Sequence, residues 1–361
     1  MAPKGTRRLG AGVSAGTPGG SRSGVLPNLG NILLRGGLIV VIAAMWLFFG
    51  IAAQGFTSEF NIFALGRAGA IAIVVALSQM VVMGIGGMNL AVGAIGGLVA
   101  IFSGTMMKTL GLPWPLAILL GLAFATLLGA INGTLIIKTR INGFIVTLAM
   151  ASVFHGTIFI VTKSDPIPDL PAGFVWFGRA SIANVSPLVF VLAATAIALF
   201  FLYRNTTLGR QMLATGASPR AAQLSGVPVD RVILITHMLS GLLAGLAGLM
   251  MASRLASAIP LIGEDWVLPS FAAAAIGGTL LSGGIVSVVG TVLGGVLVET
   301  VRSGLTLMAA ASYWVGILTG LVLLAAILLD RARAAFVLGQ AARAGSAAGA
   351  GQPDESGKLA A

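Results

Sequence analysis

The chain has 361 residues, of which 57% are hydrophobic and only 9% are charged, and its mean hydropathy is +1.02. A soluble domain carries about 25% charged residues, so this composition cannot cover a soluble body of this size with polar surface. It argues against a cytosolic enzyme and against a disordered or fibrous protein. Long unbroken apolar runs also argue against a transmembrane β-barrel, so we predict an all-α, polytopic transmembrane helical bundle.

Two terminal segments differ from the rest of the chain in composition. Residues 1–30 are rich in Gly, Ser, Pro and Arg and lack apolar periodicity, which is typical of a disordered tail. Residues 334–361 are low-complexity Ala and Gly with a few charges, and we expect a second disordered tail there. The sequence thus predicts one transmembrane domain over 31–333, with a cytoplasmic tail at each end.

Apolar runs fill the predicted domain, and each is close to the ~20 residues that a spanning helix needs. Ten runs can be counted, but only glycine-containing turns at 86–87 and 283–284 separate two of the pairs, so a count of eight or nine stays open. The runs cover 36–54, 66–85, 89–107, 114–137, 143–162, 187–203, 231–252, 266–282, 285–304 and 311–329.

The basic residues are distributed unevenly between the two sides that ten spans define. With both termini inside, 15 of the 21 Lys and Arg residues fall on the inner side, and the remainder fall on outer segments or outer helix ends. The positive-inside rule therefore predicts a multi-pass membrane protein with both termini in the cytoplasm. The same rule accounts for the net charge of +11, so no nucleic-acid partner is expected.

Two connections are too long to be simple turns. Residues 163–186, on the predicted outer side, suit an external loop with a short interfacial helix. Residues 204–230 lie on the inner side, where Ser218 suits a helix N-cap, Pro219 a first turn and Gly226 the position after the helix. We therefore predict a short capped helix in the cytoplasm, and such a helix typically meets a partner.

Motifs for catalysis and metal binding are absent from the sequence. It contains no phosphate loop, HExxH or GxSxG pattern. With no Cys and only two His, it offers no recognisable metal site. We therefore expect a non-enzyme without a cofactor or metal of its own, in which any ATP hydrolysis takes place on a separate subunit.

Four strings stand out in order along the chain, at 86–93, 142–148, 208–226 and 272–295. They read GGMNLAVG, NGFIVTL, LGR followed by GASPRAAQLSG, and AAAAIGGTLLSGG followed by GTVLGG. Together, and over roughly 36–330, they resemble the permease subunit of bacterial ABC importers of the ribose (monosaccharide) type. This resemblance implies a permease domain over 31–333 in the bacterial plasma (inner) membrane, translocating a small neutral sugar.

The resemblance also implies partners. An ABC ATPase subunit would bind ATP and Mg and dock on the inner loop, and a periplasmic or lipid-anchored binding protein would deliver the sugar outside. Two copies of the chain, surrounded by lipid, would form the pathway at their interface. The coupling residues that the third string implies are Gly209, Arg210, Ala217, Pro219, Ala221, Ala222, Ser225 and Gly226.

Polar and aromatic residues within the runs are candidates for the translocation path. Asn89 is either a hydroxyl-binding group on the path or an amide that satisfies the carbonyls of a broken helix. For Gln79 the favoured role is helix–helix hydrogen bonding, and for Thr147 it is a bond back to its own helix. Glu299 and Arg302, three residues apart, are expected to pair near the outer interface. The path candidates are Gln79, Asn89, Phe144 and Thr147.

The sequence departs from the family pattern at several positions. Asn89 stands where the pattern has Asp, and Ala91 where it has Ser. Val267-Leu268 replaces a common Glu-Leu, and Arg302 stands near a common Asn. We expect these differences to leave the fold intact and to bear on the choice of solute, since several fall within or near the expected path.

Two alternatives to a sugar permease are open. An ABC permease for another small solute, such as a nucleoside, an autoinducer furanose or a branched-chain amino acid, would share the architecture. An amino acid would need groups for both of its charged ends, and the sequence shows no convincing pair. A gradient-driven secondary transporter usually carries an intramembrane Asp, Glu or His. Only His155 and His237 lie mid-span, and a capped inner helix would have no purpose there.

Overall fold

The computed structural model describes residues 26–308, 314, 316–317 and 320–321, with side chains from residue 37 onward. Within these residues the chain is all-α, as predicted, and contains two isolated β-bridges but no extended strand. The tail predicted over 334–361 lies outside the described residues, and so does 1–30 except where α1 begins. The helices are α1 (Leu26–Ala52), α2 (Glu59–Gly84), α3 (Val92–Lys108), α4 (Trp114–Thr139), α5 (Gly143–Thr162), α6 (Ala172–Arg179), α7 (Pro187–Asn205), α8 (Thr207–Ala217), α9 (Pro219–Leu224), α10 (Val229–Leu255), α11 (Val267–Ile276) and α12 (Val288–Leu307).

Six helices of the described chain are long and apolar enough to cross a membrane: α2, α4, α5, α7, α10 and α12. The ten-span prediction is therefore not confirmed. The run over 311–329 lies largely outside the described residues, and the run over 266–282 forms only the ten-residue α11, about 15 Å long. This helix ends early because Gly277 and Gly278 follow it, and Gly278 turns the chain at a φ of +87°.

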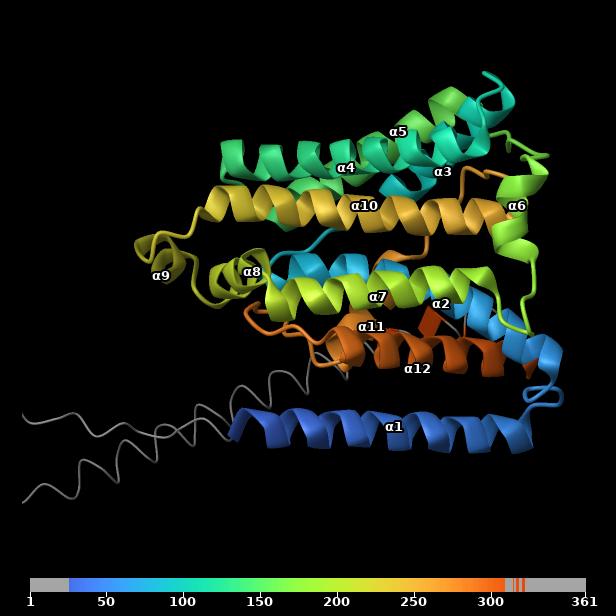
Figure 1. Cartoon of the computed structure of the whole chain (residues 1–361), viewed down its shortest axis with the longest axis horizontal. Coiled ribbons are helices and arrows are strands. Elements are labelled where there is room, and N and C mark those ends of the chain that lie inside the picture. The colour runs from blue at the N-terminus through green and yellow to red at the C-terminus, as the bar shows by residue number, and fades with distance from the viewer. Residues whose placement is uncertain (1–25, 309–313, 315, 318–319, 322–361) are drawn as a thin grey trace, which may run out of the picture.

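The central helix of the bundle is α10. In Figure 1, α4, α3 and α5 lie on one side of it, and α2, α7, α11, α12 and then α1 follow on the other side. Small residues let its neighbours approach closely. A Cβ added to Gly245 would meet Ala125 of α4, and one added to Gly248 would overlap the carbonyl of Gly96 on α3. Such close packing stabilises helix pairs in lipid, where the hydrophobic effect contributes little between helices.

Two long helices are followed by irregular chain that turns back into the bundle. After α2 the irregular segment covers 85–91 and leads to α3; after α10 it covers 256–266 and leads to α11. The second segment contacts the first turn of α3, because a Cβ on Gly93 would overlap the carbonyl of Gly263. The starts of α3 and α11 therefore lie close together inside the bundle, an arrangement of interrupted helices that transporters use around binding sites.

Glycines join three segments at the end of the bundle that carries α8 and α9 (Figure 1). A Cβ on Gly216, near the end of α8, would overlap the carbonyl of Gly84 at the end of α2 and press on the backbone N of Gly284. The Gly284 N–H in turn donates to the Gly84 carbonyl at 3.0 Å. We call these three residues the glycine node. The opposite end carries α6, the short helix that the sequence predicted within 163–186.

Candidate functional site

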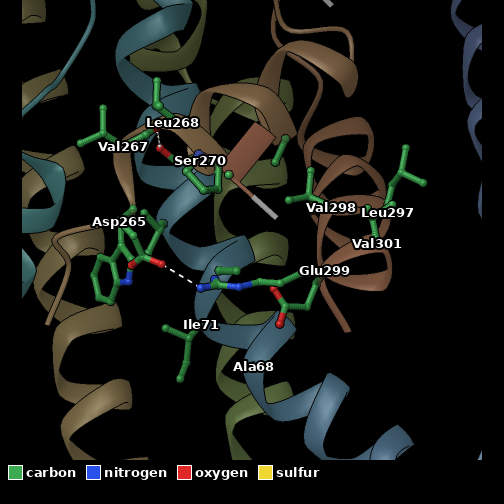
Figure 2. Close-up of a pocket in the computed structure, with 18 of the residues that line it drawn as sticks. Ala68, Ile71, Asp265, Val267, Leu268, Ser270, Leu297, Val298, Glu299 and Val301 are labelled. Carbon is green, nitrogen blue, oxygen red and sulfur yellow. Dashed lines mark hydrogen bonds and ion pairs between the residues drawn. The ribbon is translucent and has the colours of Figure 1, made fainter. Parts of the chain in front are cut away.

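A pocket of about 890 Å³ lies between α1, α2, α10, α11 and α12. Its walls on α1, α2 and α12 are largely apolar, and all of residues 264–270, before and at the start of α11, line it. Figure 2 shows Asp265, which precedes α11, and Glu299, on α12, at this space. The volume falls within the ~300–1,000 Å³ that is typical of small-molecule sites.

Charged side chains from three elements meet at this pocket. The Nη2 atom of Arg302 donates to Oδ2 of Asp265 at 2.8 Å, which ties α12 to the segment before α11 (Figure 2). Glu299 and Arg302 form no ion pair, so the predicted pairing is wrong; the irregular segment brings Asp265 to Arg302 instead. Arg254, at the end of α10, also lines the pocket and forms no ion pair within the described part of the chain.

Asn89 and Gln79 hold together the break between α2 and α3. In the amide orientation that satisfies both atoms, Gln79 Nε2 donates to the Asn89 carbonyl at 3.0 Å and Oε1 accepts from the Asn89 N–H at 3.2 Å. The Asn89 side chain donates through Nδ2 to Ser240 Oγ at 2.9 Å and accepts from the Ala91 N–H at 3.0 Å. Both side chains are buried, so these bonds satisfy backbone groups that lipid could not satisfy.

Thr147 adds a bond to this network from α5. Its Oγ1 donates to the Gly143 carbonyl of its own helix at 2.8 Å, the favoured interpretation, and accepts from the Leu90 N–H at 3.1 Å. Phe144 lies near the start of α5 and is 43% exposed; its carbonyl lies 3.3 Å from Thr147 Oγ1, but its side chain takes no part in the network. None of the four path candidates lines the pocket at α11, and their place on a translocation path stays a prediction.

The predicted inner helix has its ends where the sequence placed them. Ser218 is the N-cap of α9, with its Oγ accepting from the Ala221 N–H at 3.3 Å. Pro219 is the first residue of α9, and Gly226 follows the helix with a φ of +80°. The preceding residues form a further helix, α8, whose N-cap is Thr206.

The residues expected to couple to an ATPase differ in their exposure to solvent. Gly209 and Ala222 are buried, so Ala222 faces its own protein rather than a partner. Leu224 was not among the expected residues, yet it is 91% exposed on α9. The signal available in the sequence was that Leu224 is an apolar residue within a polar loop. The exposed members of the expected set are Arg210, Ala217, Pro219, Ala221, Ser225 and Gly226.

Apart from Glu299 and Arg302, the charged residues of the pocket were not singled out by the sequence analysis. Glu264 and Asp265 form an acidic pair between two apolar runs, and Arg254 ends the preceding run. These charges were the sequence signal that could have identified the site, because charged residues beside membrane spans are often functional. What the sequence could not supply was the path of 256–266 back into the bundle, which brings Asp265 to Arg302.

Long apolar helices, two interrupted helices and a pocket with charged lining define a multi-pass membrane protein of the transporter kind. The chain is 36% identical over 314 residues to the ribose import permease protein of Bacillus subtilis (strain 168), covering 86% of this chain and 95% of that protein. It is 29% identical over 320 residues to the L-arabinose ABC transporter permease protein of Azospirillum brasilense, with coverages of 88% and 92%. It is 32% identical over 302 residues to the fructose import permease protein of Rhizobium meliloti, with coverages of 81% and 84%.

A family model described as branched-chain amino acid transport system / permease component matches residues 61–327. The chain therefore belongs to this family of membrane permeases, and it is a multi-pass protein of the bacterial inner membrane. No solved structure matched the chain.

Proposed function

We propose that this chain is the membrane-spanning permease subunit of an ATP-driven ABC importer that translocates a small neutral sugar. The observation that carries the proposal is its similarity, over more than four fifths of its length, to permeases named for ribose, arabinose and fructose. A neutral, hydroxyl-rich solute suits a protein with only 9% charged residues. The solute would be delivered by an external binding protein, and the chain would act as a homodimer.

ATP hydrolysis is assigned to a separate subunit. The sequence lacks a phosphate loop, so ATP and Mg would be bound by the partner, and this chain would need no cofactor of its own. Docking is proposed at α8 and α9, where Leu224 is exposed and Arg210 and Arg220 add positive charge. The glycine node lies directly beneath this surface, so a movement of α8 would reach the ends of α2 and the loop before α12.

The proposed orientation places α8 and α9 in the cytoplasm and α6 outside. Lys138, Arg140, Arg204, Arg210 and Arg231 lie at the α8–α9 end, as the positive-inside rule requires of a cytoplasmic face. Both termini are then cytoplasmic if the chain crosses the membrane ten times. This count adds α1, α3, α11 with its following loop, and the run over 311–329 to the six long helices.

A branched-chain amino acid is the second candidate solute. The description of the matching family model names that class, and the pocket at α11 has both arginine and carboxylate side chains for the two charged ends of an amino acid. The sugar remains the primary proposal because the relatives that cover most of the chain are named for sugars.

Uptake in cells tests the proposal. A strain without its own sugar importers would express the chain with its cognate ATPase and binding protein and be offered radiolabelled D-ribose, L-arabinose, D-fructose or L-leucine. We expect uptake of at least one sugar that persists when the proton gradient is collapsed and ATP is maintained. Uptake of L-leucine alone would favour the second candidate. Loss of sugar uptake with the gradient would indicate a secondary transporter.

A further inference from the structure

We propose that the pocket at the start of α11 binds a neutral, polyhydroxylated solute of monosaccharide size. The inference rests on the proposed function and deepens it, because it names a place within one copy of the chain where the transported solute is held. This place differs from the one that the sequence suggested, since Asn89 and Gln79 are occupied with each other and with Ser240.

Hydrogen-bond donors and acceptors are mixed in the pocket, as a sugar requires. Each sugar hydroxyl both donates and accepts. Arg254 and Arg302 supply donors, and Glu299 and Asp265 supply acceptors. The contact between Arg302 and Asp265 is a single hydrogen bond, which leaves the other guanidinium N–H groups and Asp265 Oδ1 available. Val267 and Leu268, the first two residues of α11, line the pocket, and their N–H groups have no acceptor within their own helix.

Glu299 is the side chain that points most directly to a ligand. It is only 7% exposed, and its stem packs against α2, where a Cβ on Gly69 would lie 3.7 Å from Glu299 Cγ. Within the described part of the chain, no hydrogen bond or ion pair reaches its carboxyl group, although the residue lines the pocket (Figure 2). The charges of Arg302 and Arg254 act favourably on this carboxylate, but neither arginine forms a hydrogen bond or ion pair with it. A buried carboxylate that lacks hydrogen bonds is destabilising, so we infer that a bound solute donates them.

The composition of the pocket separates a sugar from a lipid chain. Apolar residues of α1, α2 and α12 can contact the C–H faces of a small ring, and most small-molecule sites combine such walls with a few polar groups. An acyl chain would instead leave Arg254, Asp265, Glu299 and Arg302 facing hydrocarbon, which is unfavourable for charged groups. Two family departures, at Val267 and Arg302, also line this pocket.

A single cysteine can report on occupancy, because the chain contains none. Leu268 lines the pocket and is 57% exposed, so Leu268→Cys would be alkylated by a small maleimide in the full-length chain in lipid nanodiscs. Leu110→Cys is the matched control: Leu110 lies outside the pocket, between α3 and α4, and is 62% exposed. The probes are D-ribose, L-arabinose and D-fructose, with L-leucine and 1-decanol as competitors of other classes.

We expect at least one sugar to slow alkylation of Leu268→Cys severalfold and to leave Leu110→Cys unchanged. Adding Glu299→Gln should raise the sugar concentration needed for protection about tenfold, since a hydrogen bond to a charged group is lost. Asp265→Asn is a second variant for the same comparison, should the first not fold. Glu59→Gln, an exposed carboxylate at the start of α2, should leave protection as it was.

Several results would overturn the inference. They are absence of protection by all three sugars, protection by L-leucine or 1-decanol alone, and protection that is equal with and without the pocket substitutions. Uptake separates this failure from failure of the proposed function. If the intact importer takes up a sugar and Glu299→Gln transports it normally, the pocket assignment is wrong and the permease function stands. If the unmodified importer takes up no sugar, the proposed function itself is wrong.

Discussion

Ser240 is the side chain through which the central helix holds the irregular chain after α2. Its Oγ accepts from Asn89 Nδ2 at 2.9 Å and lies 3.0 Å from Ser78 Oγ, whose hydroxyl also reaches the Ser240 carbonyl at 2.8 Å. All three side chains are buried. In the sequence, Ser240 is one small polar residue within an apolar run. Its hydrogen-bond partners become known only from the fold.

The first prediction concerns the loss of this hydroxyl. Ser240→Ala leaves the Asn89 amide without its acceptor in a buried site, which costs ~1–3 kcal/mol. We expect a lower melting temperature for the purified protein. Ser152→Ala, on the exposed face of α5, removes a hydroxyl that reaches only its own helix and should melt as the unmodified protein does. Equal melting temperatures for the two variants would contradict the assigned role of Ser240.

At the scale of helices and loops, α8 contacts the end of α2 and the loop before α12 through backbone rather than side-chain atoms. At the glycine node, Gly216 leaves no room for a Cβ beside Gly84, and Gly284 needs a positive φ of 83°. Backbone contacts cannot yield by changing rotamer, so a displacement of α8 is passed on to α2 and to the loop before α12. This stiffness is what a mechanical link between docking surface and pathway requires.

A methyl group at the node tests this link. Gly216→Ala should push α8 away from α2, an overpacking effect of ~1–3 kcal/mol. We expect uptake to fall at least tenfold while the ATPase still associates, since α9 stays exposed. The control is Gly156→Ala on α5, where an added Cβ meets nothing within 4 Å and transport should be unchanged. Normal uptake by Gly216→Ala would remove the node from the coupling route.

The docking surface on α9 has its own test. Leu224→Asp places a charge where we propose an apolar contact and should weaken ATPase association about tenfold or more, measured by co-purification and titration. Leu224→Met keeps the apolar contact and should bind normally. Ala222 is unsuitable for this test because it is 5% exposed, so a larger side chain there would disturb α9 itself. Unchanged association of Leu224→Asp would place the ATPase contact elsewhere.

For the whole molecule, the two ends of the bundle are chemically distinct. One end carries α8, α9 and most of the basic residues of the described loops, and Arg140 there forms a two-bonded pair with Asp230, at 2.8 and 3.0 Å, that joins α4 to α10. The other end carries α6 and the first residues of the irregular segment 256–266. Such an asymmetry sets the direction in which a membrane protein inserts.

Accessibility of engineered thiols in intact cells checks this direction. Gln223→Cys, on α9, should resist a membrane-impermeant maleimide added outside and react after the membrane is permeabilised. Leu110→Cys, at the opposite end, should react from outside in intact cells. Both positions are exposed, so burial does not explain a difference. The reverse pattern of labelling would invert the proposed orientation.

The features that the sequence predicted correctly are those that depend on residues close together along the chain. The run over 143–162 coincides with α5, and the caps of α9 lie where Ser218 and Gly226 indicated, because both features depend on residues a few positions apart. The run over 266–282 is helical only over Val267–Ile276, and its role as a full span is not confirmed. The difference arises because hydropathy continues through Leu280 and Leu281 after the helix has ended at Gly277.

The sequence by itself determined the class of the protein. Hydropathy, charge asymmetry and capping residues act locally or through bulk composition, so they predict an all-α membrane protein with a capped inner helix before any contact is known. Tertiary structure alone decided which polar groups are already satisfied and which are free. Asn89 and Glu299 are both polar residues in apolar surroundings, but Asn89 meets Gln79 and Ser240, whereas Glu299 faces a pocket. That difference arises from segments more than a hundred residues apart, whose meeting depends on how the whole bundle packs.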